Sequence, residues 1–549
     1  MKLSFCSFNE KDKKSINNTI IHVFISTTIT YTKSCNMFKN GLRACLQISY
    51  ITKTLYSTKN EQYLQTGLDY LKLCLNRSIQ THGDLYDKTN VHYHDYMLLK
   101  LCQHNKLDLN KLYAKDPSLF EVLHDYKLPK KIYVGLSSGI DSTFSAALLS
   151  QVYPGEVHGI YMQNWGKQQD FSVRDGQKCY ERDIKELQAL LKKPNALEVR
   201  DFHVKSFERE YWFSVFEPFL EEYKKGETPN PDISCNSMIK FNALLRYIDE
   251  VLEKDSPNKD YMLVMGHYCK RMNERGIFIA DDVGKDQSYY LSQVDSDIFK
   301  RVWFPLGHIK KRECREFSKK FDLSNFKKKD SVGICFIENE RIENKEVISR
   351  TRIFTQFLSD YLHENEGHFI SYLKREDIYQ NENDIKKALK TYVLKCEQSE
   401  RSHDLVKVYW KVKHKGVHTY TLGQRVKEPL PQTKKLAGKW YVSKKNIGKN
   451  ELEVVCGSDN VDLYNQVIHF KDIVMQDEKR LYSSEKLGIK FRSLHLSVED
   501  NEKQLIEIDS LNDNNSVTLK HKQKGINPGQ YLVVYDFHTG QVLMSSKIR

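Results

Sequence analysis

The sequence predicts an α/β protein with a doubly wound parallel sheet, a small central helical domain and a C-terminal antiparallel β-barrel. Two changes of pattern along the chain support this prediction. After Pro129, short apolar runs alternate with helical patterns, which is typical of a parallel sheet with helical crossovers. From about Glu366, short β-rich runs are separated by Gly, Asn and Asp, which is typical of an antiparallel barrel.

The first part of the chain is basic and nearly free of acidic residues. Residues 1–60 hold nine Lys and Arg against two Asp and Glu, and no acidic residue lies between Lys13 and Asn60. This hydroxyl-rich composition is typical of a mitochondrial transit peptide, with a disordered basic tail as the alternative. We therefore expect a mitochondrial matrix location, with translation starting at either Met1 or Met37.

The bulk composition excludes several classes of protein. The chain has 549 residues, 40% hydrophobic and 29% charged, and no stretch is apolar and long enough to span a bilayer, so no membrane partner is expected. Its twelve cysteines are scattered and form no Cys-x-x-Cys pair, which argues for a reducing compartment and against a structural zinc site. Most are expected to be inert, including Cys179, Cys269, Cys314 and Cys456.

The segments before and after Pro129 predict different structures. Residues 61–128 carry apolar residues at helical spacing and are expected to be a helical extension without chemistry of its own. The apolar run Ile132–Leu136 predicts a strand, and Ser142–Leu149 predicts the helix that follows it. Between this strand and helix lies a turn of small residues.

That turn, Gly135–Ser142, reads Gly-Leu-Ser-Ser-Gly-Ile-Asp-Ser. Small residues let the backbone close around phosphate oxygens, to which helix-start amides and serine hydroxyls can donate. The lysine of the Walker pattern is missing, and a tight structural turn is the alternative interpretation. The turn resembles the pyrophosphate (PP) loop of the N-type ATP pyrophosphatases, which release AMP. The usual Ser-Gly-Gly of that family reads Ser137-Ser138-Gly139 here.

Two cysteines lie inside dense motifs. Thr228–Asn236 encloses Cys235, and Lys329–Ile337 encloses Cys335. The prolines that precede Cys235 predict a rigid loop that presents its thiol. A nucleotide loop together with two positioned thiols indicates chemistry that activates an oxygen with ATP and then delivers sulfur.

Six motifs occur in the order seen in the tRNA-specific 2-thiouridylases, which thiolate the wobble uridine. These motifs are Gly159–Trp165, Thr228–Asp232, Gly266–Tyr268, Lys285–Tyr289, Gly333–Phe336 and Tyr420–Arg425. The resemblance runs from Lys131 to the C-terminus, apart from two polar stretches, Lys374–His403 and Asp500–Gly525, that we expect to be insertions or flexible loops. With the basic N-terminus, the chain resembles a mitochondrial member of that family.

The resemblance implies an ATP-dependent sulfurtransferase that adenylates the C2 oxygen of the wobble uridine of mitochondrial tRNAs and yields 2-thiouridine, AMP and diphosphate. The implied catalytic residues are Cys235, Cys335 and Asp232. The implied ATP contacts are Gly135, Leu136, Ser137, Ser138, Gly139, Ile140, Asp141, Ser142, Met162 and Gly266. The implied tRNA contacts are Asn230, Pro231, Asp232, His267, Lys285, Asp286, Gln287, Arg492 and Gln530.

The implied roles of the cysteines differ. Cys335 would carry a persulfide received from a sulfur-relay donor protein, and Cys235 would close a disulfide with it or help to release sulfide. Asp232 would handle the proton at the base. Mg²⁺ would arrive with ATP rather than on a cluster of side chains. The sequence departs from the family's pattern at Ser493, where tyrosine is usual, and at Met265, where threonine is usual.

The expected domains follow from these patterns. They are a transit peptide (1–60), a helical extension (61–128), a PP-loop catalytic domain (129–299), a central basic region that contacts tRNA and carries the second cysteine (300–365), and a β-barrel domain with insertions (366–549). Within the central region, residues 300–329 carry a local charge of +8, with a solvated helical face as the alternative to a tRNA contact.

Two other functions remain open from the sequence. One is a different adenylating enzyme with the same loop, such as an argininosuccinate synthase-like enzyme or an amidotransferase, which would need no pair of motif-embedded cysteines. The other is a non-catalytic tRNA-binding relative that has lost turnover.

Overall fold

The computed structural model divides the chain into two units, Met1–Gln62 and Tyr63–Arg549. The described residues are 58–80, 94–165, 179–193, 197–272, 276–330, 340–343, 346–363, 365–374, 392–430, 438–493 and 505–549. Most of the predicted transit peptide and the predicted catalytic residue Cys335 therefore lie outside the described residues. No helix in the described part of the chain is long and apolar enough to cross a membrane.

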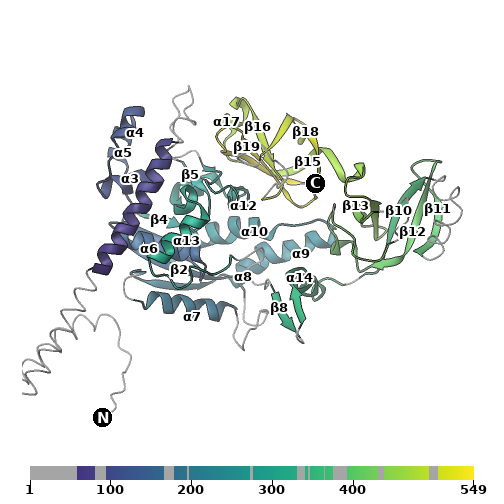
Figure 1. The fold of residues 1–549 in the computed structure, drawn as a ribbon, viewed down its shortest axis with the longest axis horizontal. Helices are drawn as coiled ribbons and strands as arrows, with labels where there is room; N and C mark the ends of the chain where they lie inside the picture. The colour runs from purple at the N-terminus through teal and green to yellow at the C-terminus, as the bar shows by residue number, and fades with distance from the viewer. Residues whose placement is uncertain are drawn as a thin grey trace, which may run out of the picture. The chain divides into compact units, whose positions relative to one another are not determined.

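A five-stranded parallel sheet with strand order β3-β2-β1-β4-β7 confirms the predicted doubly wound fold (Figure 1). The strands are β1 (Lys131–Leu136), β2 (Glu156–Gln163), β3 (Phe202–Ser206), β4 (Tyr261–Val264) and β7 (Val302–Trp303). The chain adds strands on one side of β1 and then returns to add β4 on the other. Ligands of such sheets bind at the carboxyl end of the strand where the order reverses, and the loop after β1 lies there.

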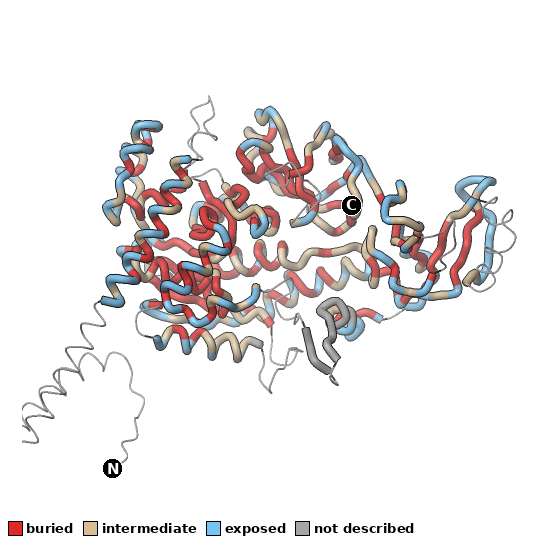
Figure 2. Tube along the Cα trace, viewed as in Figure 1, coloured by how far each residue is buried: buried red, intermediate tan, exposed pale blue. Residues whose placement is uncertain are grey.

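The two faces of the sheet bury two different hydrophobic clusters. Ile132 and Val134 of β1 pack in one cluster with Phe144 of α6 (Ile140–Val152), whereas Tyr133 packs in the other. Alternate residues of a strand point to opposite faces, so both faces of the sheet are covered, and buried residues are concentrated along it (Figure 2).

Helical segments cover both faces. The second cluster is covered by α8 (Glu208–Tyr211), the π-helical turn η1 (Trp212–Phe216), α9 (Glu217–Lys224), α10 (Pro231–Ser234), π-helical η2 (Cys235–Ala243), α11 (Leu244–Tyr247) and π-helical η3 (Ile248–Leu252). Pro218 lies in the first turn of α9, directly after the π-helical turn η1. The first cluster is covered by α6, α7 (Cys179–Leu191) and α13 (Lys311–Lys320).

The predicted boundary at residue 300 is corrected by the structure. β7 is the edge strand of the parallel sheet, and α13 packs on α6 through Phe317 and Phe144, so residues 302–321 belong to the layers of the parallel sheet. A strand of two residues leaves no periodic pattern, which explains why the sequence did not reveal it. The remaining helix of the predicted central region is α14 (Arg350–Ser359).

The N-terminal extension is helical in its described residues. Residues 58–80 form a helix, and α3 (Tyr96–His104), α4 (Asn110–Lys115) and α5 (Leu119–Asp125) follow. The buried apolar side chains between Tyr63 and Leu123 join the first cluster of the sheet. The extension therefore shares a hydrophobic core with α6 and α13.

The C-terminal region contains two β-structures rather than one. A closed barrel with order β15-β18-β17-β16-β19-β20 confirms the predicted antiparallel barrel, but only from Tyr464 onward. Its strands are β15 (Tyr464–Met475), β16 (Leu487–Lys490), β17 (Ile506–Asn512), β18 (Ser516–Lys524), β19 (Tyr531–Asp536) and β20 (Val542–Ile548). A separate five-stranded sheet comprises β10 (Gly367–Lys374), β11 (Val393–Gln398), β12 (Leu405–His414), β13 (Trp440–Asn446) and β14 (Glu451–Cys456).

The predicted insertion at Asp500–Gly525 is wrong over most of its length. Strands β17 and β18 lie within it and pair with each other in the barrel. Only every second side chain of such a strand needs to be apolar, as in Val517 and Leu519, so the strand's composition resembles a polar loop. In the other predicted insertion, Lys374–His403, β11 pairs with β12.

Candidate active site

Serine hydroxyls hold the loop between β1 and α6 in a closed turn. The Ser137 amide donates to Ser142 Oγ over 3.0 Å. The Ser142 hydroxyl in turn donates to the Ser137 carbonyl over 3.0 Å. The Gly139 amide donates to Ser137 Oγ over 3.2 Å. Gly139 is the N-cap of α6 and has no side chain to cover the helix start. Because the first amides of a helix lack intrahelical partners, this turn is suited to receive an anion.

Two glycines allow the backbone around this loop to pack closely. A Cβ atom at Gly135 would lie 2.4 Å from Met265 Sδ and 3.8 Å from Met162 Cε. A Cβ atom at Gly266 would lie 2.8 Å from the Ser142 amide nitrogen. Glycine is therefore needed at position 266, where the close atoms are backbone at the start of α6, whereas Gly135 meets only flexible methionine side chains.

A buried lysine binds the carboxylate at the start of α6. Lys311 Nζ lies 2.7 Å from both carboxylate oxygens of Asp141 and 2.7 Å from Asp330 Oδ1. Burial by itself lowers the pKa of Lys311, but the two carboxylates outweigh it and the pKa lies above its ordinary value. Tyr268 donates to Asp141 over 3.0 Å, and Cys314 Sγ lies 3.7 Å from the same oxygen. Asp141 thus has a cation beside it, although the Walker lysine is absent.

The sequence did not identify Lys311 as a site residue. It stands in the basic segment 300–329, where nothing local distinguishes it from its neighbours. Its place beside Asp141 depends on the packing of α13 against α6, which involves residues far apart in the chain.

Ser138, the residue that departs from the family's usual glycine, is buried with a bound hydroxyl. Its hydroxyl donates to Asp183 and accepts from Lys328, and its carbonyl accepts from Asn325 Nδ2 over 2.9 Å. Lys328 also lies 2.8 Å from Glu186. The additional side chain is therefore accommodated by α7 and the turn that follows α13.

These contacts show that several basic residues of 300–329 pair with carboxylates inside the protein. Lys311 and Lys328 are engaged in ion pairs around the phosphate loop. Arg301 forms an ion pair with Asp249. Net charge counts every lysine and arginine equally, so it cannot separate side chains that pair internally from those that face solvent.

Cys235 begins the helical segment η2 and is buried. Burial, reinforced by the nearby Asp232 carboxylate and opposed by Lys240, raises the pKa of its thiol to about 11. The thiol is therefore protonated at neutral pH in the free protein.

The C-terminal barrel holds the loop that leads to Cys235. Gln530 Nε2 donates to the Thr228 carbonyl over 2.6 Å, and Asn230 Nδ2 donates to Gln530 Oε1 over 3.4 Å. The Thr228 amide donates to the Pro528 carbonyl over 2.8 Å. The structure thus brings together Gln530 and Asn230, two of the predicted tRNA contacts.

His267 connects the phosphate loop with the Cys235 segment. Gly266, its neighbour, touches the start of α6, while the His267 ring packs 5.8 Å from Phe241 of η2 and 5.9 Å from Phe304. Burial, with a smaller effect of Lys240, holds the pKa of His267 well below its usual range, so the ring is neutral. In the free protein His267 is a packed core residue, and its predicted tRNA contact stays a prediction.

Within the Lys285-Asp286-Gln287 motif, Asp286 is buried and Gln287 is half-buried, whereas Lys285 is exposed. The Asp286 carboxylate and the Lys490 ammonium of β16 are fully buried and 2.9 Å apart. Gln287 accepts from the Tyr268 amide over 2.9 Å, and Lys285 lies 2.9 Å from Asp330. In the free protein Asp286 thus forms an ion pair with the barrel, and its predicted tRNA contact stays a prediction.

Arg492, the remaining predicted tRNA contact, lies directly after β16. Its guanidinium donates to the Lys524 carbonyl over 3.2 Å. Burial lowers the pKa of the Arg492 guanidinium, and the nearby Tyr289 opposes this effect. Arg492 lies two residues after Lys490, the residue of β16 that binds Asp286.

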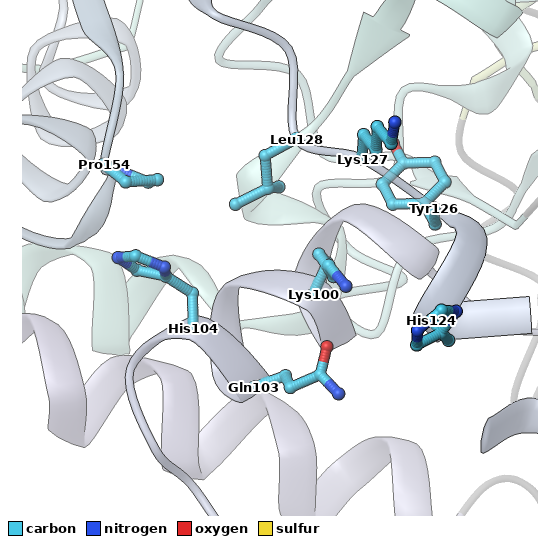
Figure 3. Close-up of a pocket in the computed structure, with 8 residues that line it drawn as sticks. All are labelled: Lys100, Gln103, His104, His124, Tyr126, Lys127, Leu128 and Pro154. Atoms are coloured by element: carbon cyan, nitrogen blue, oxygen red, sulfur yellow. The ribbon is translucent and has the colours of Figure 1, made fainter. Parts of the chain in front are cut away.

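One cavity of about 410 Å³ lies away from all of these residues (Figure 3). It is lined by Lys100, Gln103, His104, His124, Tyr126, Lys127, Leu128 and Pro154. It contains no predicted site residue, so cavity size does not locate the candidate site in this protein.

The sheet and its phosphate loop define an α/β nucleotide-binding domain, and comparison with known proteins identifies its class. Residues 130–339 match the family model described as "tRNA methyl transferase HUP domain". Residues 409–456 match the model described as "tRNA methyl transferase PRC-barrel domain". The second match falls within the five-stranded sheet that precedes the closed barrel.

Individual relatives match most of the chain. The mitochondrial tRNA-specific 2-thiouridylase 1 of Saccharomyces cerevisiae is 33% identical over 426 residues, which is 74% of this chain and 90% of the yeast protein. The tRNA-specific 2-thiouridylase MnmA of Oceanobacillus iheyensis is 33% identical over 74% of this chain and 92% of its own. The MnmA of Buchnera aphidicola is 35% identical over 63% and 79%. The chain belongs to the tRNA-specific 2-thiouridylase family.

A solved structure adds little to this assignment. The NH3-dependent NAD synthetase of Campylobacter jejuni is 14% identical over 41% of this chain and 80% of its own, with a TM-score of 0.21. A likeness of that size carries no argument about fold or function.

Proposed function

We propose that this protein is an ATP-dependent sulfurtransferase that replaces the C2 oxygen of the wobble uridine in mitochondrial tRNAs with sulfur. One observation carries the proposal beyond family membership. Gly266 touches the start of α6, and the next residue, His267, packs against the helical segment that begins at Cys235. Gly266 and His267 thus connect the phosphate loop with the segment that carries the Cys235 thiol. The proposed reaction needs both a nucleotide-binding loop and a thiol.

The residues around the loop fit ATP. Ser137 and Ser142 offer hydroxyls, and the start of α6, against which Gly266 packs, offers amides. ATP would supply the adenylate that turns the C2 oxygen into a leaving group. We propose that Mg²⁺ enters with ATP beside Asp141.

In the sulfur step, we propose that Cys335 carries a persulfide delivered by a donor protein. Its terminal sulfur attacks C2 of the activated uridine, and AMP leaves with the oxygen. The Cys235 thiolate then attacks the Cys335 sulfur, forming a disulfide and releasing 2-thiouridine. A thiol reductant must reduce the disulfide before the next turnover.

Asp232 is the proposed proton acceptor in this site. The thiol of Cys235 is protonated at neutral pH and must lose its proton before it can attack, and Asp232 lies close enough to influence its pKa. We further propose that Asn230, Pro231 and Asp232 face the target base, with Gln530 behind them on the barrel. The proposed docking surface for the tRNA backbone is the exposed part of the basic segment, including Lys327 and Lys329.

The proposed location is the mitochondrial matrix. The basic N-terminus, with only two acidic residues, supports a transit peptide over residues 1–60, and a yeast relative is named as mitochondrial. In the proposed domain organisation, the phosphate loop and both cysteines precede residue 366, and the second five-stranded sheet and the closed barrel follow it.

The decisive experiment is thiolation in vitro with the full chain, ATP, Mg²⁺, a persulfide donor and mitochondrial tRNA, followed by mass analysis of the nucleosides. The wild type should give the mass change of an oxygen-to-sulfur exchange together with AMP. Cys335→Ser should give no product yet bind ATP normally, because a hydroxyl cannot hold a persulfide. Cys235→Ser should stop turnover while persulfide accumulates on Cys335. The matched control is Cys396→Ser, at an exposed cysteine, which should remain active.

Other outcomes would contradict the proposal. A methylated nucleoside would favour the activity in the family models' description. Product from Cys335→Ser would remove that residue from the mechanism.

A further inference from the structure

The helical extension of residues 63–128 precedes the family match, which begins at residue 130, yet it is built into the phosphate-loop side of the sheet. The Tyr70 ring lies 5.7 Å from Phe144 of α6 and 5.9 Å from Phe317 of α13. Aromatic pairs at these separations add to the stabilisation that burial provides. The extension therefore touches both helices that meet at Asp141.

Polar contacts from the extension converge on the segment that leads into α13. Arg77 forms a bidentate ion pair with Glu313, with nitrogen–oxygen distances of 2.8 and 2.7 Å, and also donates to the His308 carbonyl over 2.8 Å. The Glu313 carboxylate in turn accepts from the Lys310 amide over 2.8 Å, which caps the start of α13. Bidentate arginine–carboxylate pairs fix orientation as well as distance.

The start of α3 provides a second set of contacts to the segment that leads into α13. Its N-cap residue, Asp95, accepts from Trp303 Nε1 over 2.9 Å and lies 3.2 Å from His308 Nε2. Tyr70 also donates to the Pro305 carbonyl. The segment from β7 to α13 is thus bound by three side chains of the extension.

The first residue of α13 is Lys311, whose ammonium binds both oxygens of Asp141 in the phosphate loop. Glu313, two positions further on, is the residue that Arg77 binds. A shift of the first turn of α13 would move both residues together, because helical backbone transmits displacement over such a short span.

We propose that the extension is a brace that fixes the start of α13 and, through Lys311, holds Asp141 in the position that ATP binding requires. Arg77 and Asp95 are positioning residues of this brace. The proposal rests on the proposed function in one respect, namely that the phosphate loop binds ATP. The extension would then have a role in the activity, although none of its residues belongs to the phosphate loop.

The test compares Arg77→Met with the wild type in the full chain. The dissociation constant of Mg·ATP should rise roughly 2- to 30-fold, the range seen when a residue acts on a site through intervening structure, while tRNA affinity stays unchanged. Arg77→Lys keeps the charge but loses the bidentate geometry and should lie between the two. The matched control is Arg200→Met, which removes an exposed ion pair between Arg200 and Glu156 of β2 and should leave ATP affinity unchanged.

Hydrogen exchange without ATP provides a second, independent readout. Amides at the start of α13 should exchange at least about twofold faster in Arg77→Met than in the wild type, because the capping carboxylate loses its partner. Failure of the wild type to bind ATP would refute the proposed function, and exchange would then decide the brace by itself. Unchanged exchange, or equal ATP affinity in Arg77→Met and wild type, would overturn the brace.

Discussion

The Cys235 thiol should react slowly with iodoacetamide at neutral pH in the free protein. Burial raises its pKa to about 11 from an ordinary 9.0, and only the thiolate is nucleophilic. At pH 8 a thiol with a pKa of 9.0 is about 10% ionised, whereas one with a pKa of 11 is about 0.1% ionised. Alkylation of Cys235 should therefore be about 100-fold slower than that of an ordinary cysteine from ionisation alone, and burial slows it further.

The assay measures alkylation of each cysteine by mass spectrometry of its peptide, from about pH 7 to about pH 11. The Cys235 rate should rise about tenfold per pH unit up to about pH 10 and less steeply as the pH approaches the pKa of about 11. The exposed Cys396 serves as a reference in the same molecule. Cys235 in urea-unfolded protein gives the unperturbed rate. A rate for Cys235 at pH 8 equal to that in urea, or a plateau near pH 9, would refute the assignment of a buried, protonated thiol.

Two variants test the electrostatic part with opposite signs. Asp232→Asn removes a carboxylate that raises the pKa, so Cys235 should react faster at pH 8. Lys240→Gln removes a cation that lowers the pKa, so Cys235 should react more slowly. A change in the same direction in both variants would show that altered packing, rather than charge, controls the thiol.

The raised pKa of Cys235 makes the stability of the folded protein depend on pH. The folded-state pKa lies above the unfolded-state pKa, so unfolding releases a proton between the two values. The contribution of Cys235 to stability is therefore fully present below about pH 9 and is lost as the pH rises through about 11.

Two further predictions concern packing around the site. Gly266→Ala should weaken ATP binding about tenfold or more, measured by titration calorimetry, because its Cβ would lie 2.8 Å from the Ser142 amide and must displace the loop; unchanged affinity would mean that the loop can yield freely. Asp286→Asn and Lys490→Met should each lower the free energy of unfolding by about 3–5 kcal/mol in urea denaturation, since each leaves one buried charge unpaired, whereas the double variant should recover most of that loss. Additive losses in the double variant would show that the pair is not coupled.

Local sequence determined the parallel sheet and the phosphate loop. The apolar run Ile132–Leu136 and the turn Gly135–Ser142 are defined by residues that are neighbours in the chain, and the structure has the predicted strand, turn and helix there. Backbone conformation and helix-start amides depend on adjacent residues, so a pattern of a few residues suffices to predict them. The predicted loop around Cys235 is wrong in part, because Pro231 starts the helix α10 and Cys235 lies buried in the helical segment that follows it.

Only the tertiary structure decided which polar residues face the site and which face the protein. Lys311 reaches Asp141 across 170 residues, and Asp286 meets Lys490 across 204. A lysine in a basic segment has the same sequence signature whether it is exposed or paired inside, because burial depends on which elements pack against it. The separation of residues 367–456 into a sheet of their own, and the place of α13 beside α6, were decided in the same way by contacts between distant segments.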